Sequence, residues 1–343
     1  MSVPRKNDTN LTPRGPVLVT GGAGYIGSHT NRLLRERGVE TVVLDNLSTG
    51  HKAAVEGAFE QVDLGDRAAL DRVLQKYKPT AVVHFAAKTY VGESVENPAI
   101  YYRENVFHTW NLLEAMRAHQ VGAIVFSSTC ATYGNPIEVP MTEAHPQAPI
   151  SPYGRTKLHM EHMLADYAAA YGIAFAALRY FNAAGAHPKG DIGEVHVPET
   201  HLIPLVLQVA LEQRREIAIF GDDYPTPDGT CIRDYVHVVD LADAHLRALG
   251  LLQAGERDLR VNLGTGTGYS VKEVIDCARR VTGHAIPARV APRRPGDPPC
   301  LVSGGTHARD LLGWVPARAE LETIVRDAWA FQRRHPQGYA GHT

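Results

Sequence analysis

The sequence lacks most features that mark secreted, membrane-spanning or metal-binding proteins. Its 343 residues hold four cysteines, none at C-x-x-C spacing, so neither a disulfide-stapled domain nor a zinc module is expected. No apolar run approaches the roughly 18 residues that cross a bilayer. The 17 histidines show no H-E-x-x-H or comparable spacing. We therefore expect a cytoplasmic protein with free thiols, no membrane partner and no bound metal.

An excess of charge of either sign is also missing. The chain has 35 Lys and Arg against 37 Asp and Glu, a net charge of −2, and its basic residues are scattered. No nucleic-acid partner is therefore expected. The 44% hydrophobic and 21% charged residues are typical of a globular enzyme, and the length suggests one large or two coupled domains. Residues 1–15 are polar, contain Pro4 and Pro13, and are predicted to form a flexible tail.

The first half of the chain alternates short β-rich runs with helical patterns. Strands are predicted at Val17–Thr20, Thr41–Leu44, Ala81–Phe85, Ala123–Ser127 and Phe175–Tyr180. Helices are predicted at Tyr25–Arg37, from Asp66 to before Pro79, at Pro98–His119 and at Pro152–Tyr171. Strands that are apolar throughout indicate a parallel sheet covered on both faces, hence an α/β fold with a Rossmann-type doubly wound sheet.

The second half of the chain has shorter elements and more Pro, Gly and His. The capping box Ser270-Val-Lys-Glu273 predicts one further helix start. We expect an NAD-binding domain at residues 16–185, to which 234–250 return. A smaller α/β substrate-binding lobe is expected at 186–233 and 251–343.

A glycine fingerprint follows the first predicted strand. Gly21 allows a tight turn, Gly24 lets the backbone approach a pyrophosphate, and Gly27 lets helix and strand pack closely. The helix that follows presents free N–H groups to phosphate. Asp45, at the end of the second strand, suits the adenosine ribose hydroxyls and repels a 2′-phosphate. The cofactor is therefore predicted to be NAD, with Asp63 expected at the adenine edge.

A second motif places a phenol beside an ammonium group. Tyr153 and Lys157 are four residues apart on a predicted helix and share one face. The ammonium, together with an oxidised nicotinamide, is expected to favour the phenolate and move Tyr153 toward the range of a general base. Ser127-Ser128-Thr129 ends a strand at the same edge of the sheet, where such folds bind ligands. The pattern indicates redox chemistry at a carbinol carbon.

The combined motifs resemble the extended short-chain dehydrogenase/reductase superfamily, and within it the family of UDP-glucose 4-epimerases. The resemblance runs from about Val17 to Trp314. Residues 219–237 (IFGDDYPTPDGTCIRDYVH) are the most specific stretch, and shorter ones are VVLDNL at 42–47, HFAA at 84–87, VGES at 91–94, RYFN at 179–182 and RRPGD at 293–297.

The resemblance implies a retained NAD that works catalytically. Tyr153 would take the proton of the sugar 4-hydroxyl, with Thr129 bonding the same oxygen. The 4-keto sugar would then turn about its bond to the diphosphate and be reduced on its other face. The substrates would be UDP-glucose and UDP-galactose.

Further site residues follow from the resemblance, motif by motif. Cofactor contacts are expected from Gly21, Gly24, Tyr25, Ile26, Gly27, Asp45, Asn46, Ser48, Asp63, Leu64, Phe85, Ala86, Ala87, Asn105, Ser127, Tyr153, Lys157 and Tyr180. Substrate contacts are expected from Thr129, Tyr153, Asn182, His201, Leu202, Phe220, Arg233, Tyr235, Arg294, Asp297 and Leu301. Among these, Arg233 and Arg294 would clamp the two phosphates, a role that suits the guanidinium fork.

The chain departs from the family pattern at two positions. Some members carry a lysine where this chain has Thr89, which leaves open whether Lys88 reaches the NAD diphosphate instead. At the position that limits sugar size the chain has Leu301, which implies some tolerance of UDP-GlcNAc and UDP-GalNAc.

Alternative functions are weighed against the same residues. A 4,6-dehydratase would need an acid pair where Cys130 and Ala131 stand. Intact Tyr153, Lys157 and Thr129 argue against a non-catalytic NAD sensor. Another NAD-dependent epimerase or a decarboxylase of the UDP-glucuronate type stays open. The superfamily commonly dimerises through two long helices, so a homodimer built on a four-helix bundle of 98–119 and 152–171 is expected.

Overall fold

The main sheet of the protein is parallel and doubly wound. The computed structural model describes residues 12–294, 296–304 and 306–341. Among them, seven strands pair in parallel in the order β10-β6-β5-β4-β1-β2-β3. The chain starts at β1 inside the sheet and then moves outward on both sides, which is the Rossmann order. The predicted fold class is confirmed.

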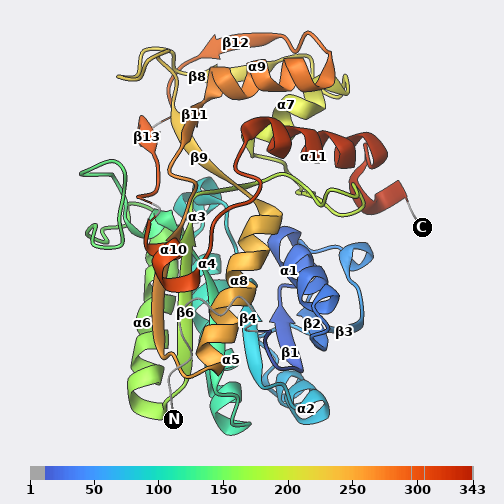
Figure 1. The fold of residues 1–343 in the computed structure, drawn as a ribbon, viewed down its shortest axis with the longest axis vertical. Helices are drawn as coiled ribbons and strands as arrows, with labels where there is room; N and C mark the ends of the chain where they lie inside the picture. The colour runs from blue at the N-terminus through green and yellow to red at the C-terminus, as the bar shows by residue number, and fades with distance from the viewer. Residues whose placement is uncertain (1–11, 295, 305, 342–343) are drawn as a thin grey trace.

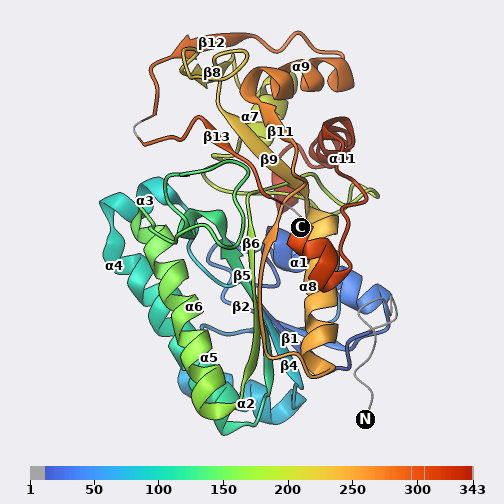
Figure 2. The ribbon, with the colours of Figure 1, turned by 60° about the vertical axis from the view of Figure 1, so that its left-hand side comes forward.

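The strands of this sheet are buried because helices cover both of its faces. α1 (Tyr25–Glu36) and α8 (Val238–Gln253) lie on one face, and α2 (Arg67–Tyr77), α5 (His108–Ala118) and α6 (Pro152–Tyr171) lie on the other (Figure 2). This double cover explains the apolar runs. The strands are β1 (Val17–Thr20), β2 (Thr41–Asp45), β3 (Ala58–Gln61), β4 (Ala81–His84), β5 (Ala123–Thr129), β6 (Ala174–Tyr180) and β10 (Asp258–Leu263).

Three of the predicted helices begin at a residue whose side chain caps the helix. Asp66 accepts a hydrogen bond from the Ala69 amide at 2.9 Å, and Ser151 accepts one from Gly154 at 3.2 Å. Ser270 and Glu273 form the reciprocal capping box that opens α9 (Val271–Thr282).

The helix predicted at 98–119 is interrupted. It consists of α4 (Pro98–Tyr101), the π-helical segment η2 (Tyr102–Phe107) and α5. π-Helical segments of this kind are frequent at functional sites.

A smaller lobe sits beyond the carboxyl ends of the main strands (Figure 1). It has its own core, in which Val206, Ile275 and Ile324 are fully or almost fully buried. Its elements are β7 (Asn182–Ala184), α7 (Leu202–Ala210), β8 (Ile217–Phe220), β9 (Ile232–His237), β11 (Gly268–Ser270), α9, β12 (Ala288–Ala291), β13 (Cys300–Leu301) and α11 (Leu321–Arg334). Short helical turns elsewhere are η1 (Lys52–Ala54), α3 (Val91–Glu96), η3 (Cys130–Thr132) and η4 (Gly338–Gly341).

The structure differs from the predicted division at residues 251–343, which were assigned as a whole to the lobe. β10 pairs with β6 in the main sheet, and α10 (Thr306–Leu312) packs on the core of that sheet. The reason is apolar burial, because alternate residues Leu259, Val261 and Leu263 face this core and leave almost no exposed surface.

Residues 1–11 of the predicted tail lie outside the described residues, whereas the backbone of Arg14 is hydrogen-bonded to the side chain of Gln253. In the described part of the chain, no helix has the length and apolarity that crossing a membrane requires.

Candidate active site

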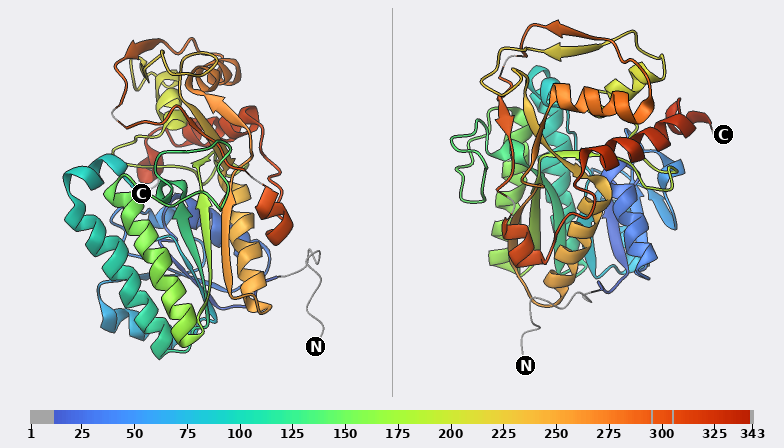
Figure 3. Two further views of the ribbon diagram at one scale, coloured as in Figure 1. Left: turned by 90° about the vertical axis from the view of Figure 1, so that its left-hand side faces the viewer. Right: turned by 45° about the horizontal axis from the view of Figure 1, so that its top comes forward.

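One cavity of about 450 Å³ lies where the main sheet meets the lobe. Figure 3 shows the lobe placed over the carboxyl ends of the strands, which is where doubly wound sheets bind ligands. The cavity brings together most of the predicted cofactor residues. They are Gly21, Gly24, Tyr25, Ile26, Gly27, Asp45, Asn46, Ser48, Leu64, Phe85, Ala86, Ala87, Ser127, Tyr153, Lys157 and Tyr180.

The glycine turn makes a close backbone crossing that side chains would prevent. Gly21 has φ of +71°, and a Cβ there would lie 2.5 Å from the Ala86 nitrogen. A Cβ on Gly27 would lie 2.3 Å from the Gly21 carbonyl oxygen. The first turn of α1 has no side-chain cap, so its amides stay available to an anion. These residues fit the pyrophosphate of NAD.

The acid at the end of β2 is fixed by backbone amides. Asp45 accepts hydrogen bonds from Ala23 at 3.0 Å and from Leu47 at 2.8 Å. Burial raises the pKa of Asp45, and these two hydrogen bonds lower it. The carboxylate is thus held in one orientation at the cavity wall, as binding of ribose hydroxyls requires.

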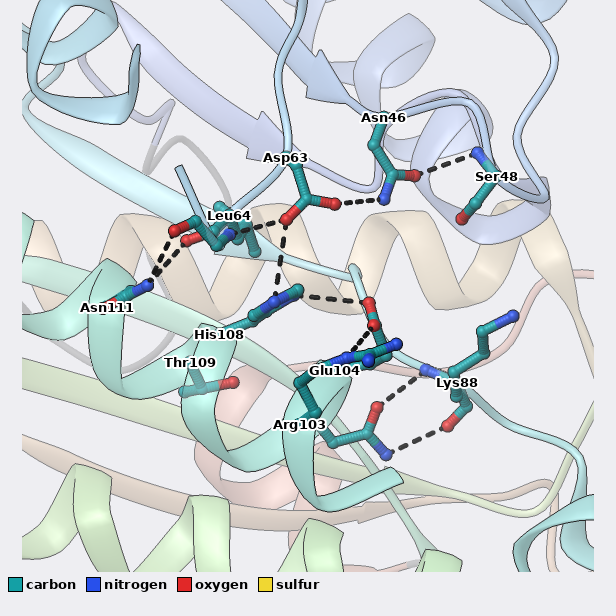
Figure 4. Close-up of polar contacts among 12 residues, drawn as sticks. Asn46, Ser48, Asp63, Leu64, Lys88, Arg103, Glu104, His108, Thr109 and Asn111 are labelled. Carbon is teal, nitrogen blue, oxygen red and sulfur yellow. Dashed lines mark hydrogen bonds and ion pairs between the residues drawn. The ribbon is translucent and has the colours of Figure 1, made fainter. Parts of the chain in front are cut away.

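Asp63 takes a supporting position rather than a place in the cavity lining. It accepts a hydrogen bond from the Asn46 side chain at 2.7 Å and one from the Gly65 amide at 2.7 Å (Figure 4). His108 Nε2 lies 3.6 Å from the same carboxylate, and His108 Nδ1 lies 3.4 Å from Glu104. Glu104 and His108 do line the cavity, and the sequence motifs did not single them out.

Asn105 also lies behind the wall of the cavity. Its side-chain oxygen accepts a hydrogen bond from the Lys88 amide at 2.7 Å, and its side-chain nitrogen donates to the Lys88 carbonyl at 3.1 Å. The same nitrogen also donates to the Thr156 hydroxyl on α6 at 3.0 Å. The loop after β4 is thereby fixed to η2 and α6. Lys88 and Thr89 both line the cavity.

The reaction end of the cavity is formed by β5 and α6. Tyr153 is buried, which raises the pKa of its phenol, and a hydrogen bond with the Thr129 side chain acts in the opposite direction. The Lys157 ammonium donates to the Ser127 carbonyl at 2.8 Å, and burial lowers its pKa to about 7. The Ser127 hydroxyl is hydrogen-bonded to Tyr180.

A buried ion pair holds α6 against the sheet. Glu161, one turn beyond Lys157, pairs with Arg179 of β6 through two hydrogen bonds of 2.9 and 2.6 Å and accepts a third from Ser128 at 2.5 Å. Both side chains are almost fully buried. The sequence does contain a signal for Glu161, because it follows Lys157 by four residues and therefore lies on the same face of the helix.

The predicted substrate residues divide between two cavities. Thr129, Tyr153, Asn182, His201, Arg233 and Leu301 line the cavity described above. Arg294 and Asp297 line a neighbouring one of about 630 Å³.

Contacts among these residues connect the two cavities. Arg233 forms an ion pair with Asp297, and the Arg294 guanidinium lies 4.1 Å from the centre of the Phe220 ring. Leu202, Phe220 and Tyr235 are not among the described residues that line either cavity. Leu202 and Tyr235 pack into the core of the lobe.

Acids and imidazoles that the motifs did not single out meet His201 at the cavity. Glu194 and His196 line it as well. Although burial alone would lower it, the carboxylates of Glu194 and Glu199 raise the pKa of His196 to about 9. They raise the pKa of His201 to about 10.

Fold and site together define a dinucleotide-dependent enzyme of the Rossmann class. Its marks are the glycine turn, the acid that ends β2, and a buried tyrosine and threonine that line the same cavity. The chain belongs to the NAD dependent epimerase/dehydratase family, whose model matches residues 17–264.

Relatives of known name span nearly the whole chain. The UDP-glucose 4-epimerase of Halalkalibacterium halodurans is 53% identical over 325 residues, which cover 94% of this chain and 97% of that protein. The enzyme of the same name from Lacticaseibacillus casei is 50% identical, with coverage of 94% and 98%. A solved UDP-glucose 4-epimerase of Brucella ovis in complex with NAD superimposes with a TM-score of 0.90 at 52% identity, covering 92% of this chain and 97% of the other.

Proposed function

We propose that this protein interconverts UDP-glucose and UDP-galactose. The sugar is oxidised at C4, turns about its bond to the diphosphate, and is reduced on its other face. The observation that carries this proposal is that Tyr153 and Thr129 line the same cavity as the glycine turn of Gly21 and Gly27. Full-length similarity to UDP-glucose 4-epimerases supports the same reaction.

Tyr153 acts as the base and then as the acid. Its phenol oxygen takes the proton of the sugar 4-hydroxyl, directly or through the Thr129 hydroxyl, and returns it after the sugar has turned. NAD, which the glycine turn and Asp45 would hold, would supply a reversible hydride acceptor for C4 and, when oxidised, a positive charge that favours the phenolate. No net oxidation results, because the same carbon is oxidised and reduced.

Lys157 contributes positive charge and position. Its Nζ is anchored to the Ser127 carbonyl at 2.8 Å, so the ammonium is held at the end of β5. An ammonium within the same buried site favours the phenolate of Tyr153, and its remaining N–H groups are available to ribose hydroxyls.

The UDP part of the substrate is assigned to the lobe and to both cavities. Asn182, His201 and Arg233 face the main cavity and suit the diphosphate. Arg294 and Asp297 face the neighbouring cavity, where a uridine would find a cation and a carboxylate for ribose hydroxyls. The Arg294 guanidinium lies over the Phe220 ring. The Arg233–Asp297 ion pair ties these two regions together.

The decisive experiment uses the purified protein with UDP-galactose and no added NAD. Formation of UDP-glucose is followed by a coupled assay, and conversion would establish both the reaction and a retained cofactor. Absence of conversion even with NAD added would contradict the proposal. UDP-glucuronate would then be tested, since enzymes that act on it share the cofactor site.

The pair UDP-GlcNAc and UDP-GalNAc is proposed as a second substrate pair. Leu301 lines the main cavity and is smaller than a tyrosine, so an N-acetyl group has more room. Conversion of this pair should fall in a Leu301→Tyr variant while conversion of the glucose pair persists. Activity on the N-acetyl pair no higher than background in the parent protein would refute this extension.

We also propose a homodimer in which η2, α5 and α6 pair with their copies. These helices lie side by side on the outside of the molecule (Figure 2). Tyr102, Phe107, Trp110 and Tyr171 on them are exposed, and exposed aromatic groups of this kind mark interfaces. Sedimentation analysis of the parent protein and of Trp110→Glu tests the assembly, since the variant should be shifted toward monomer.

A further inference from the structure

Four side chains with metal-binding groups meet in the segment between β7 and α7. They are Glu194, His196, Glu199 and His201, here called the Glu194 cluster. One ligand atom of each lies within 4.8 Å of all the others. His201 Nδ1 is 2.8 Å from Glu194 and 3.1 Å from Glu199. His196 Nδ1 is 3.2 Å from Glu194 and 3.7 Å from Glu199.

The two carboxylates of the Glu194 cluster need two positive charges to balance them. The carboxylates of Glu194 and Glu199 are each only 6% exposed and face the same two imidazoles. Buried carboxylates are costly unless they are paired or bound to a metal. Either both imidazoles carry a proton, or one divalent cation supplies both charges while the imidazoles stay neutral.

The spacing of the ligand atoms matches a tetrahedral ion. Zinc bonds of about 2.0–2.1 Å to nitrogen and oxygen place neighbouring ligands about 3.3–3.4 Å apart. The two nitrogens lie 2.8 and 3.2 Å from Glu194 Oε1, and 3.1 and 3.7 Å from the Oε1 and Oε2 atoms of Glu199, so these distances lie on both sides of this value. Two imidazoles and two carboxylates are a donor set that suits zinc.

The surroundings of the cluster hold one ligand in place and leave a path for entry. The Oε1 atom of Glu199 accepts hydrogen bonds from the amides of Thr200 at 2.7 Å and His201 at 2.8 Å. Hydrogen bonds of this kind orient a ligating carboxylate. The His201 side chain is 44% exposed and gives an ion access from solvent.

We propose that the Glu194 cluster binds a divalent transition-metal ion of the zinc type. This inference goes beyond the expectation from sequence that the chain holds no metal. The other acidic and imidazole group, Asp63 with Glu104 and His108, is less suitable because it offers a single imidazole and Asp63 is already bonded to Asn46.

Metal binding would also inhibit the reaction, a consequence that rests on the proposed function. Glu194, His196 and His201 line the main cavity, and His201 is assigned to the diphosphate. An imidazole that ligates a metal is neutral and fixed in direction, so it can no longer donate a charged hydrogen bond to phosphate.

The test uses the full-length protein freed of metals by a chelator and then titrated with Co²⁺, a coloured substitute for Zn²⁺. We expect the intense visible absorption of tetrahedral Co²⁺, saturation at one equivalent, and its loss when Zn²⁺ is added. Glu199→Gln should weaken Co²⁺ binding by more than the roughly 10–100-fold that loss of an outer partner costs. His201→Ala removes a ligand from a half-exposed position, so it keeps the test valid if Glu199→Gln folds poorly.

Glu104→Gln is the matched control, because it changes an acid of the other group. It should leave Co²⁺ binding unchanged. Absence of the tetrahedral spectrum, or binding that Glu199→Gln and His201→Ala do not weaken, would overturn the proposal. Binding that only Glu104→Gln weakens would also overturn it. Co²⁺ binding is read without substrate, so failure of the epimerase assay leaves this result separate.

Discussion

The ion pair of Glu161 and Arg179 provides the most direct test of how the catalytic helix is held. Glu161→Gln removes the carboxylate charge but nearly keeps the volume of the side chain. It leaves a guanidinium that is 3% exposed without its counter-charge. Breaking a buried pair in this way costs about 3–5 kcal/mol, a large part of the stability of an ordinary domain.

This loss of unfolding free energy can be converted into a decrease in melting temperature. An unfolding entropy of about 2.1 cal/mol/K per residue, applied to 343 residues, gives about 0.7 kcal/mol/K. Glu161→Gln should therefore melt about 4–7 °C below the parent protein. Calorimetry at a fixed pH and protein concentration measures the difference.

An exposed ion pair of the same residue types is the control. Arg326 and Glu322 lie at 2.5 Å on α11, with side chains 57% and 60% exposed. Glu322→Gln should change the free energy of unfolding by less than about 1 kcal/mol. Surface substitutions usually change the free energy of unfolding by no more than roughly 0.5 kcal/mol, which corresponds to less than about 1 °C here. If Glu161→Gln melted within about 1 °C of Glu322→Gln, the expected cost of breaking the buried pair would be refuted.

Glu161 also influences the pKa of Lys157, and so the pH dependence of the reaction. The Glu161 carboxylate raises the pKa of the Lys157 ammonium against the larger effect of burial, which lowers it to about 7. In Glu161→Gln this pKa should fall further. If activity needs the ammonium, the alkaline limb of the rate profile should move to lower pH, a change that a loss of stability alone does not produce.

Three further predictions follow from single contacts. Tyr153→Phe should lower kcat by about 10²–10⁴-fold while the purified protein keeps its NAD, and loss of the NAD would show a structural role instead. Gly27→Ala places a Cβ 2.3 Å from the Gly21 oxygen, so its NAD content and melting temperature should both fall. Gly92→Ala meets no atom within 4 Å and should match the parent in both. Lys157 has its pKa lowered to about 7, so between about pH 7 and 10 the unfolded chain binds a proton that the folded chain does not. Urea unfolding should therefore show the parent gaining stability relative to Lys157→Met as pH rises, and a constant difference would contradict the pKa.

Local signals in the sequence predicted much of the main domain. The caps at Asp66, Ser151 and Ser270 act through neighbours three residues away, so a short window contains the whole interaction. The glycine turn is equally local, because Gly21 and Gly27 contact each other.

Features that depend on distant partners were not predictable in this way. β10 joins the main sheet because β6, more than 80 residues earlier, offers it an edge. The buried carboxylate of Asp234 accepts hydrogen bonds from the amides of Thr265 and Gly266 and from the Thr265 hydroxyl, which lie 31 and 32 residues further along the chain. The Glu194 cluster is close in sequence, yet its spacing matches no regular element, so only the folded loop shows that four side chains converge.

The path of the chain between the domain and the lobe has a consequence for how long a bound cofactor stays. The described chain passes between the two parts five times: from β6 to β7, from β9 to α8, from β10 to β11, from β13 to α10 and from α10 to α11. Domain closure by a hinge ordinarily turns on a few residues in one or two connections. Five connections spread across the cavity oppose such a swing, so release of a dinucleotide requires local opening of loops. The slow exchange expected from this architecture would make NAD a resident part of the enzyme instead of a co-substrate that comes and goes.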